Sequence, residues 1–196
     1  MLNLCAFLSS ENIDIDLFVN NNIDLPEPLN NQIINTLTKD KIISELTKFS
    51  LLVKNTHNNL SMHRLLQEVV RKQQGEDIQW LIYCLRMISS SINYVHGSID
   101  SLNSFKCGIT HAISVTEYFS NLYLNDNVIT LFSEEVFQFF ASLYFTMGLG
   151  LEAMGLYRQS LKHHKKSLHI LKNIIDDKGV QTKVSPRDWT VKGFVY

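Results

Sequence analysis

The chain has 196 residues, of which 45% are hydrophobic and 19% are charged, so it can bury a core and is not a disordered tail. Its 18 lysines and arginines nearly balance its 19 aspartates and glutamates, which excludes a global positive field for binding nucleic acid or an anionic membrane. The three cysteines lie far apart in the sequence, as is typical of proteins in a reducing compartment. We therefore expect a cytoplasmic protein.

No targeting or membrane segment is predicted. Residues 1–8 are apolar, but they lack a basic region and are shorter than the core of a signal peptide. The most apolar stretch, residues 136–151, is interrupted by Gln138, Thr146 and glycines, and we find no run of about 18 apolar residues. We interpret this stretch as a packed helix.

Residues 1–74 are predicted to form a small unit of helices with one hairpin. Apolar residues at helical spacing indicate helices over residues 2–8, 14–19, 29–37 and 42–49. The period then changes: residues 51–53 and 60–62 are strand-like and flank a turn-forming segment, and a further helix begins at His63. Helices followed by a hairpin and a last helix are the order expected of a winged helix.

The remaining chain is predicted to be helical, which makes the protein mainly α. We expect a helical connector over residues 76–132, containing helices at 78–94 and 104–118. A pair of helices follows over residues 133–175, broken at Gly155. The periodicity fades in residues 176–196, which stay unassigned.

The hairpin and last helix of the first unit carry the most informative motif. Met62-His63-Arg64 stands where the strand enters the helix, and His63-Arg64-Leu65-Leu66-Gln67 continues it. This segment resembles the winged-helix domain that follows the nucleotide-binding domain in NB-ARC and related STAND-class switch ATPases. That family commonly has Met-His-Asp at this point, and a branch with tetratricopeptide repeats often has His-Arg, an apolar pair and Gln. The resemblance covers about residues 1–73.

The resemblance implies a nucleotide-sensing role for His63, in an intact parent protein only. In resting NB-ARC switches the matching histidine contacts the β-phosphate of ADP, and an imidazole N–H at a helix start suits an anion. Arg64 stands in place of the family's aspartate, so no role is carried over to it. The alternative is that His63 only caps or packs the junction between hairpin and helix.

The phosphate-binding half of such a switch is missing from this sequence. No Gly-x-x-x-x-Gly-Lys-Ser/Thr loop occurs, and Gly-Lys never occurs. We expect no cofactor in this chain, and the resemblance implies ADP or ATP for an ATPase domain upstream. The chain is then a fragment, a degenerate gene product or half of a split system.

The helix pair at 133–175 resembles a tetratricopeptide repeat. The matching positions are Tyr144, Met147-Gly148, Leu151, Gly155, Tyr157, Ser160, His164 and Ser167-Leu168. Small residues let two helices approach closely, and large residues fill the gaps between repeats. Serine replaces the usual alanine twice, and no proline ends the second helix. We expect the outer face of Leu161, Leu168, Leu171 and Ile175 to be partly exposed, or covered by the tail or a partner chain.

We expect a regulatory and protein-interaction segment of a STAND-type signalling switch, with a protein partner bound through helical repeats. The alternatives are a winged-helix transcription regulator that binds DNA, and a non-functional gene fragment. Arg64, Arg71 and Lys72 on the last helix and Lys54 on the hairpin are few cations for phosphate contacts, so no nucleic acid is expected.

An enzyme is the least favoured class, and no catalytic or metal-binding residues are assigned. His163, His164 and His169 lie among lysines, but no carboxylate or cysteine has metal-ligand spacing with them. We interpret this histidine cluster as part of a solvated helix face.

Overall fold

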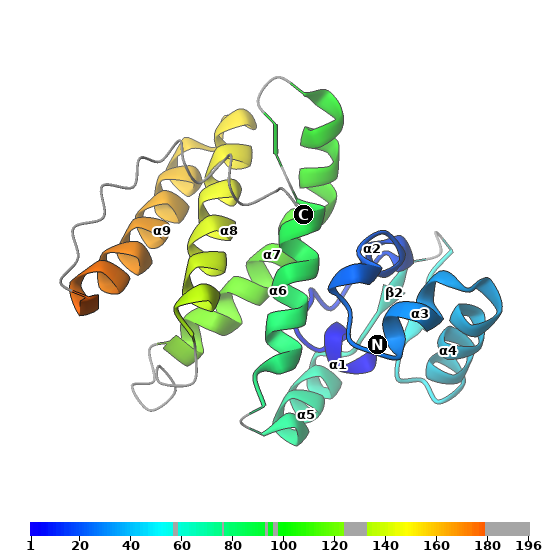
Figure 1. Ribbon diagram of the computed structural model, residues 1–196. Coiled ribbons are helices and arrows are strands. Elements are labelled where there is room, and N and C mark those ends of the chain that lie inside the picture. The colour runs from blue at the N-terminus through cyan, green and yellow to red at the C-terminus, as the bar shows by residue number, and fades with distance from the viewer. Residues whose placement is uncertain (57–58, 76, 93, 96–97, 124–132, 179–196) are drawn as a thin grey trace. The chain divides into compact units, whose positions relative to one another are not determined.

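The computed structural model describes residues 1–56, 59–75, 77–92, 94–95, 98–123 and 133–178 (Figure 1). The chain divides into two compact units, Met1–Leu131 and Phe132–Tyr196. This division lies one residue from the expected boundary between the connector and the helix pair.

Unit 1 is built from short helices around one small hairpin. Their bounds are α1 Leu2–Cys5, α2 Ile15–Asn20, the 3-10 helix η1 Asn22–Asp24, α3 Leu29–Ile34, α4 Thr36–Lys48, β1 Val53–Lys54, β2 Leu60–Ser61, α5 Arg64–Gln74, α6 Gln79–Ser91 and α7 Ile99–Tyr123. Side chains define where two of the helices begin. Asp14 accepts a hydrogen bond from the backbone of Asp16 at the start of α2, and Asn35 accepts from Leu37 and Thr38 at the start of α4.

The hairpin pairs Val53 with Ser61 and Lys54 with Leu60 in antiparallel register. Ile13, between α1 and α2, adds an isolated antiparallel bridge to Leu60 on the other edge. Two backbone hydrogen bonds, of 2.9 and 2.8 Å, join these two residues. The hairpin is thereby tied to the segment that follows α1.

The expected connector is not a separate piece of the molecule. Helix α6 packs against α1, α2 and α7, and it buries Leu81, Cys84, Leu85, Met87 and Ile88. Its apolar face is therefore part of the unit 1 core, which is why the expected division near residue 75 is not a division between compact units.

Unit 2 consists, over its described residues, of the antiparallel helices α8 Glu134–Ala153 and α9 Tyr157–Lys178, which lie side by side in Figure 1. Gly155 joins them with a positive φ of 76°, a conformation that favours glycine, and a Cβ there would meet nothing within 4 Å. The sequence prediction of a turn at Gly155 is confirmed.

The described residues thus form a mainly α protein with one short hairpin, as the sequence predicts. One described helix, α8, is long and apolar enough to cross a membrane, by length and composition only, and half of its apolar window is buried. The helix coincides with the interrupted apolar stretch at residues 136–151 that the sequence predicts to be a packed helix. A packed core helix passes the same test, and α8 packs against α9.

Candidate functional site

His63 occupies the N-cap position of α5, at the junction between the hairpin and the helix. Its backbone is extended, with φ −61° and ψ 135°, and its Nδ1 accepts a hydrogen bond of 3.2 Å from the backbone N–H of Leu65. A neutral ring whose Nδ1 accepts carries its proton on Nε2. The exposed imidazole is therefore set to donate from Nε2, and the same geometry satisfies one unpaired N–H of the first helical turn.

The position of His63 is fixed by the residue before it. Met62 is buried, with 2% of its surface exposed, and its backbone N–H donates to Ser10 at 2.9 Å. Together with the bridge between Ile13 and Leu60, this bond aligns β2 with the segment of residues 8–13, which we call the junction loop. The chain enters α5 from a constrained strand.

Side chains on the buried face of α5 form hydrogen bonds with the backbone at the start of the junction loop and at the end of α1. Gln67 is 5% exposed, and its Nε2 donates to the carbonyls of Cys5 and Leu8 at 2.9 and 3.0 Å. One turn later the Arg71 guanidinium donates to the carbonyl of Ala6. These donors satisfy carbonyls at the end of α1 that have no partner in such a short helix. The Gln of the motif is therefore a structural residue.

His111 of α7 holds the junction loop from the opposite side. Its Nδ1 accepts from the backbone N–H of Ser9 at 3.1 Å, and its Nε2 lies 3.2 Å from the carbonyl of Asn12, to which it donates. The ring is 3% exposed. Burial lowers the pKa of His111, against smaller opposing effects from the Asn12 carbonyl and Asp14. A neutral ring is the form that makes both bonds.

Two apolar side chains of α5 and one of the hairpin are exposed to solvent. Leu65 is 65% exposed, Val69 is 49% exposed, and Val53 on the hairpin is 60% exposed. Leu65, Leu66, Val69 and Val70 stand at neighbouring helical positions, but only Val70 of these four is buried. The helix turns Gln67 and Val70 inward because the end of α1 needs the Gln67 donor, so Leu65 and Val69 face outward.

Residues 1–77 match the family model of a domain of unknown function, DUF7779. This match covers every element from α1 to α5, including the hairpin and His63. No curated protein and no solved structure matches the chain.

The helix pair of unit 2 forms the second candidate region, built on small residues. Ser160 and Ser167 of α9 are each 4% exposed, and the Ser167 hydroxyl donates to the carbonyl of Ala141 in α8 at 2.7 Å. The His164 ring lies against Gly148, where an added Cβ would be 2.4 Å from its Cε1. Serine hydroxyls and a glycine thus let the helices approach closely, as the sequence predicts.

The interpretation of the histidine cluster as solvated is wrong for two of its members. His163 packs against Tyr144, with ring centroids 5.8 Å apart, and His164 packs against Phe145 at 5.3 Å. Burial lowers the pKa of His163 to about 4, helped by Lys166, Lys162 and His164. The rings turn inward because α8 offers aromatic partners and a glycine there. Among the described residues, no group of three potential metal ligands occurs.

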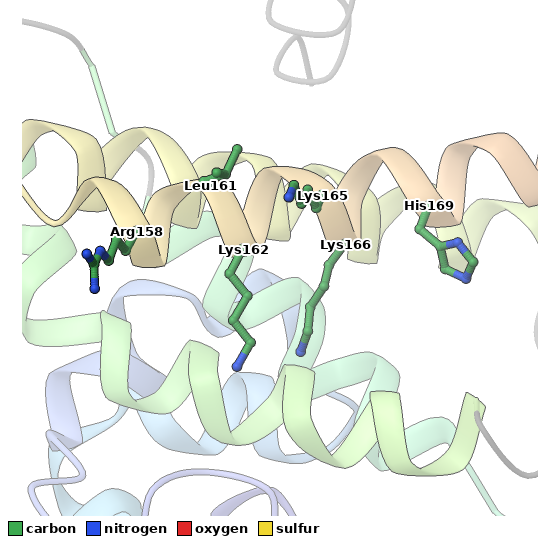
Figure 2. A pocket seen from close by; sticks show the side chains of 6 residues that line it. All are labelled: Arg158, Leu161, Lys162, Lys165, Lys166 and His169. Atoms are coloured by element: carbon green, nitrogen blue, oxygen red, sulfur yellow. The ribbon is translucent and has the colours of Figure 1, made fainter.

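Shallow hollows occur in both units. One, of about 590 Å³, lies between the start of α1 and the helices α3 and α4. The other, of about 430 Å³, runs along α9 and is lined mainly by basic side chains (Figure 2).

Neither Cys5 nor Cys84 offers a reactive thiol. Both are free and completely buried, and burial raises the pKa of each, to about 12 for Cys5. The Cys84 thiol donates to the carbonyl of Leu4 at 3.2 Å.

Proposed function

We propose that this chain is a regulatory and protein-interaction segment of a STAND-type nucleotide switch, with unit 1 as its winged-helix domain. The observation that carries the proposal is the exposed His63 imidazole at the start of α5. Capping by Nδ1 leaves Nε2 as an outward donor, so the capping role and the phosphate-sensing role are compatible. The bridge from Ile13 to the hairpin also suits a winged helix, in which a short strand precedes the hairpin.

The exposed apolar residues of α5 and the hairpin support a docking role for this part of unit 1. Leu65, Val69 and Val53 present apolar surface to solvent. Exposed apolar surface is typical of an interface. In the parent protein, a nucleotide-binding domain covers this face and brings the phosphates of ADP to His63. We assign no catalytic residue to the chain itself, and ADP or ATP belongs to that partner domain.

A set of hydrogen bonds within unit 1 connects the strand before His63 with α7. The strand that precedes His63 is hydrogen-bonded to Ser10 and Ile13 of the junction loop. His111 of α7 is hydrogen-bonded to Ser9 and Asn12 of the same loop. A shift of His63 on loss of ADP therefore strains the contact with α7. In this proposal the change at His63 reaches α7 within unit 1, and the helical repeat binds a protein partner.

In the DNA-binding alternative, one of the four basic side chains is not available for contacts with phosphates. The Arg71 guanidinium donates to Ala6 and lies 5.3 Å from the centre of the Tyr118 ring, so it does not face outward for phosphates. Arg64, Lys72 and Lys54 are then left, with Glu68 exposed among them. Phosphate recognition usually needs more cations than this, and we favour the switch segment. The cytoplasm is the compartment we propose for it, since the three cysteines are free.

The first test is the DNA sequence upstream of the codon for Met1. The proposal requires an open reading frame, or a neighbouring gene, that encodes a Gly-Lys phosphate-binding loop. Absence of such a domain would favour the gene-fragment alternative.

The second test uses the protein that this reading frame encodes. His63→Ala should speed the release of a fluorescent ADP analogue by roughly tenfold, because one phosphate hydrogen bond is lost. Arg64→Ala is the matched control, since Arg64 is also exposed at the start of α5 but has no assigned role. Equal release rates for His63→Ala and the unchanged protein would reject the sensing role.

A further inference from the structure

The contact with α8 determines which side of α9 faces away from the pair. Ser160, Ser167 and Ile170 are each 4% exposed and point toward α8. The His164 ring on Gly148 and the Lys166 ammonium, 5.1 Å from the centre of the Tyr144 ring, continue this inner face. The opposite side of α9 has no partner among the described residues of unit 2.

This outer side carries two parallel stripes. The apolar stripe consists of Tyr157, Leu161 and Leu168, which are 69%, 55% and 54% exposed. The basic stripe consists of Arg158, Lys162, Lys165 and Lys172, all exposed. Residues four and seven apart lie above one another on a helix, so each stripe runs along its length. The exposure expected for Leu161 and Leu168 is confirmed, Leu171 is only partly exposed, and the side chain of Ile175 lies outside the described residues.

The two stripes lie beside one another. Figure 2 shows Leu161 projecting to one side of α9, Lys162 and Lys166 projecting to the other, and Lys165 between them. The hollow along α9 borders both stripes, because Leu161 and the lysines line it together.

The charge of this segment is entirely positive. Residues 153–175 contain five of the chain's 18 lysines and arginines and not one of its 19 aspartates and glutamates. The chain as a whole has a net charge of −1, so the positive charge here is concentrated. A surface of this kind attracts an acidic partner and sets its orientation.

We propose that the outer side of α9 binds an acidic amphipathic helix of a partner protein. The leucines and Tyr157 pack against the partner's apolar residues, and the basic stripe pairs with a row of carboxylates on one flank of that helix. The inference deepens the proposed function, because it names the chemistry of the partner that the helical repeat binds.

The arrangement of the stripes favours a protein helix over a membrane. A helix that lies on a membrane has cations on both flanks of its apolar face, since both flanks meet lipid headgroups. On α9 the cations lie on one flank, and contact with α8 occupies the other. Nucleic acid is also disfavoured, because phosphates would leave Leu161 and Leu168 uncovered.

The test measures binding of the full chain to a labelled synthetic peptide by fluorescence anisotropy. The peptide is a helix of about 20 residues with leucines on one face and glutamates along one flank of that face. We expect saturable binding that weakens by roughly tenfold between low salt and about 0.5 M salt.

Charge-swapped variants make the test specific. The double variant Lys162→Glu, Lys165→Glu should no longer bind the glutamate peptide and should instead bind an otherwise identical peptide with lysines in place of the glutamates. The double variant Leu161→Ser, Leu168→Ser should bind neither peptide. Lys41→Glu with Lys106→Glu makes the same charge change at exposed positions of unit 1 and should leave binding unchanged. Circular dichroism checks that each variant is folded.

Three results would overturn the proposal. They are a lack of saturable binding to the glutamate peptide, equal binding of the lysine peptide by the unchanged chain, and displacement of the peptide by phosphatidylserine vesicles or a DNA duplex. The last result would assign the surface to a membrane or to nucleic acid. A missing phosphate-binding loop upstream would reject the proposed function and leave peptide binding untouched, so the two failures are distinguishable.

Discussion

Gln67 and His111 hold the same junction loop from two different helices. Gln67 donates to the carbonyl of Leu8, and His111 accepts from the N–H of Ser9 and donates to the carbonyl of Asn12. A loop with this many buried backbone groups needs side-chain partners, since each unpaired group costs about 1–3 kcal/mol. These two side chains therefore determine the loop conformation on which the position of His63 depends.

We predict that unit 1 loses stability as the pH falls below about 6.5, where the histidine ring of the unfolded chain gains a proton. The pKa of His111 is lowered in the folded protein, mainly by burial, so the unfolded state binds more protons between the two pKa values. The free energy of unfolding therefore rises with pH in this range. Urea unfolding at pH 7.5 and pH 5 measures the difference.

His111→Gln is the informative variant for this prediction. Glutamine can both accept and donate a hydrogen bond but does not titrate, so the pH dependence of unfolding should shrink. His169→Gln, on the outer side of α9, is the control. A pH dependence unchanged by His111→Gln would show that another group is responsible.

At the scale of elements, α8 and α9 form a pair of helices, and neighbouring residues of α9 differ strongly in how much of their side chains is exposed. Ile170 is 4% exposed, whereas Leu168, two positions earlier, is 54% exposed. This difference follows from the helical period, because residues two positions apart point to nearly opposite sides of a helix, and only one side of α9 packs on α8. We therefore expect the same substitution to have different effects on stability at Leu168 and at Ile170.

We predict that Ile170→Asp unfolds unit 2 and that Leu168→Asp does not. A carboxylate at the buried position costs at least about 3 kcal/mol, because it loses its water without gaining a partner. The same carboxylate at the exposed position changes stability by no more than about 0.5 kcal/mol. Helicity at 222 nm during thermal unfolding measures both. Equal destabilisation would mean that Leu168 lies in a closed core.

We also predict that Gly148→Ala destabilises the pair by about 1–3 kcal/mol, which is typical of overpacking. The new methyl group would lie 2.4 Å from His164 Cε1 and 2.6 Å from its Nδ1, so the ring must leave its place beside Phe145. The test is a double-mutant cycle with His164→Ala, in which Gly148→Ala should cost little. Additive effects of the two substitutions would exclude the close contact as the cause.

At the scale of the whole molecule, the chain contains two compact units that the proposed function uses differently. Unit 1 presents His63 and the exposed Leu65 and Val69 of α5, and unit 2 presents the stripes of α9. The Gly-Lys pair of the common phosphate-binding loop, whose backbone N–H groups surround phosphates, does not occur in the sequence of either unit.

We therefore predict that the isolated chain neither hydrolyses ATP nor binds ADP tightly. One imidazole donor supplies only part of the affinity that a phosphate-binding loop and its lysine provide. Titration calorimetry with ADP up to about 1 mM should give only the heat of dilution. A dissociation constant in the micromolar range would contradict both the prediction and the missing-domain proposal.

The sequence by itself determined the mainly α class, the single hairpin, the helix start at His63 and the turn at Gly155. These features depend on residues that are close in the sequence. The spacing of apolar residues distinguishes helix from strand, capping residues mark where a helix begins, and glycine allows a positive φ at a turn. The sequence also predicts the start of a helix at Ser133, because Glu134 and Glu135 follow it.

Only the tertiary structure decided which faces are buried. Gln67 is buried and Leu65 is exposed because backbone carbonyls at the end of α1, about sixty positions earlier, need hydrogen-bond donors. The spacing of apolar residues cannot show such a requirement. His111 bonds to the junction loop across 102 residues of chain, and no local pattern marks it. His163 and His164 face α8 because its aromatic residues and Gly148 lie opposite. Long-range partners satisfy buried polar groups, and their identity depends on the fold as a whole.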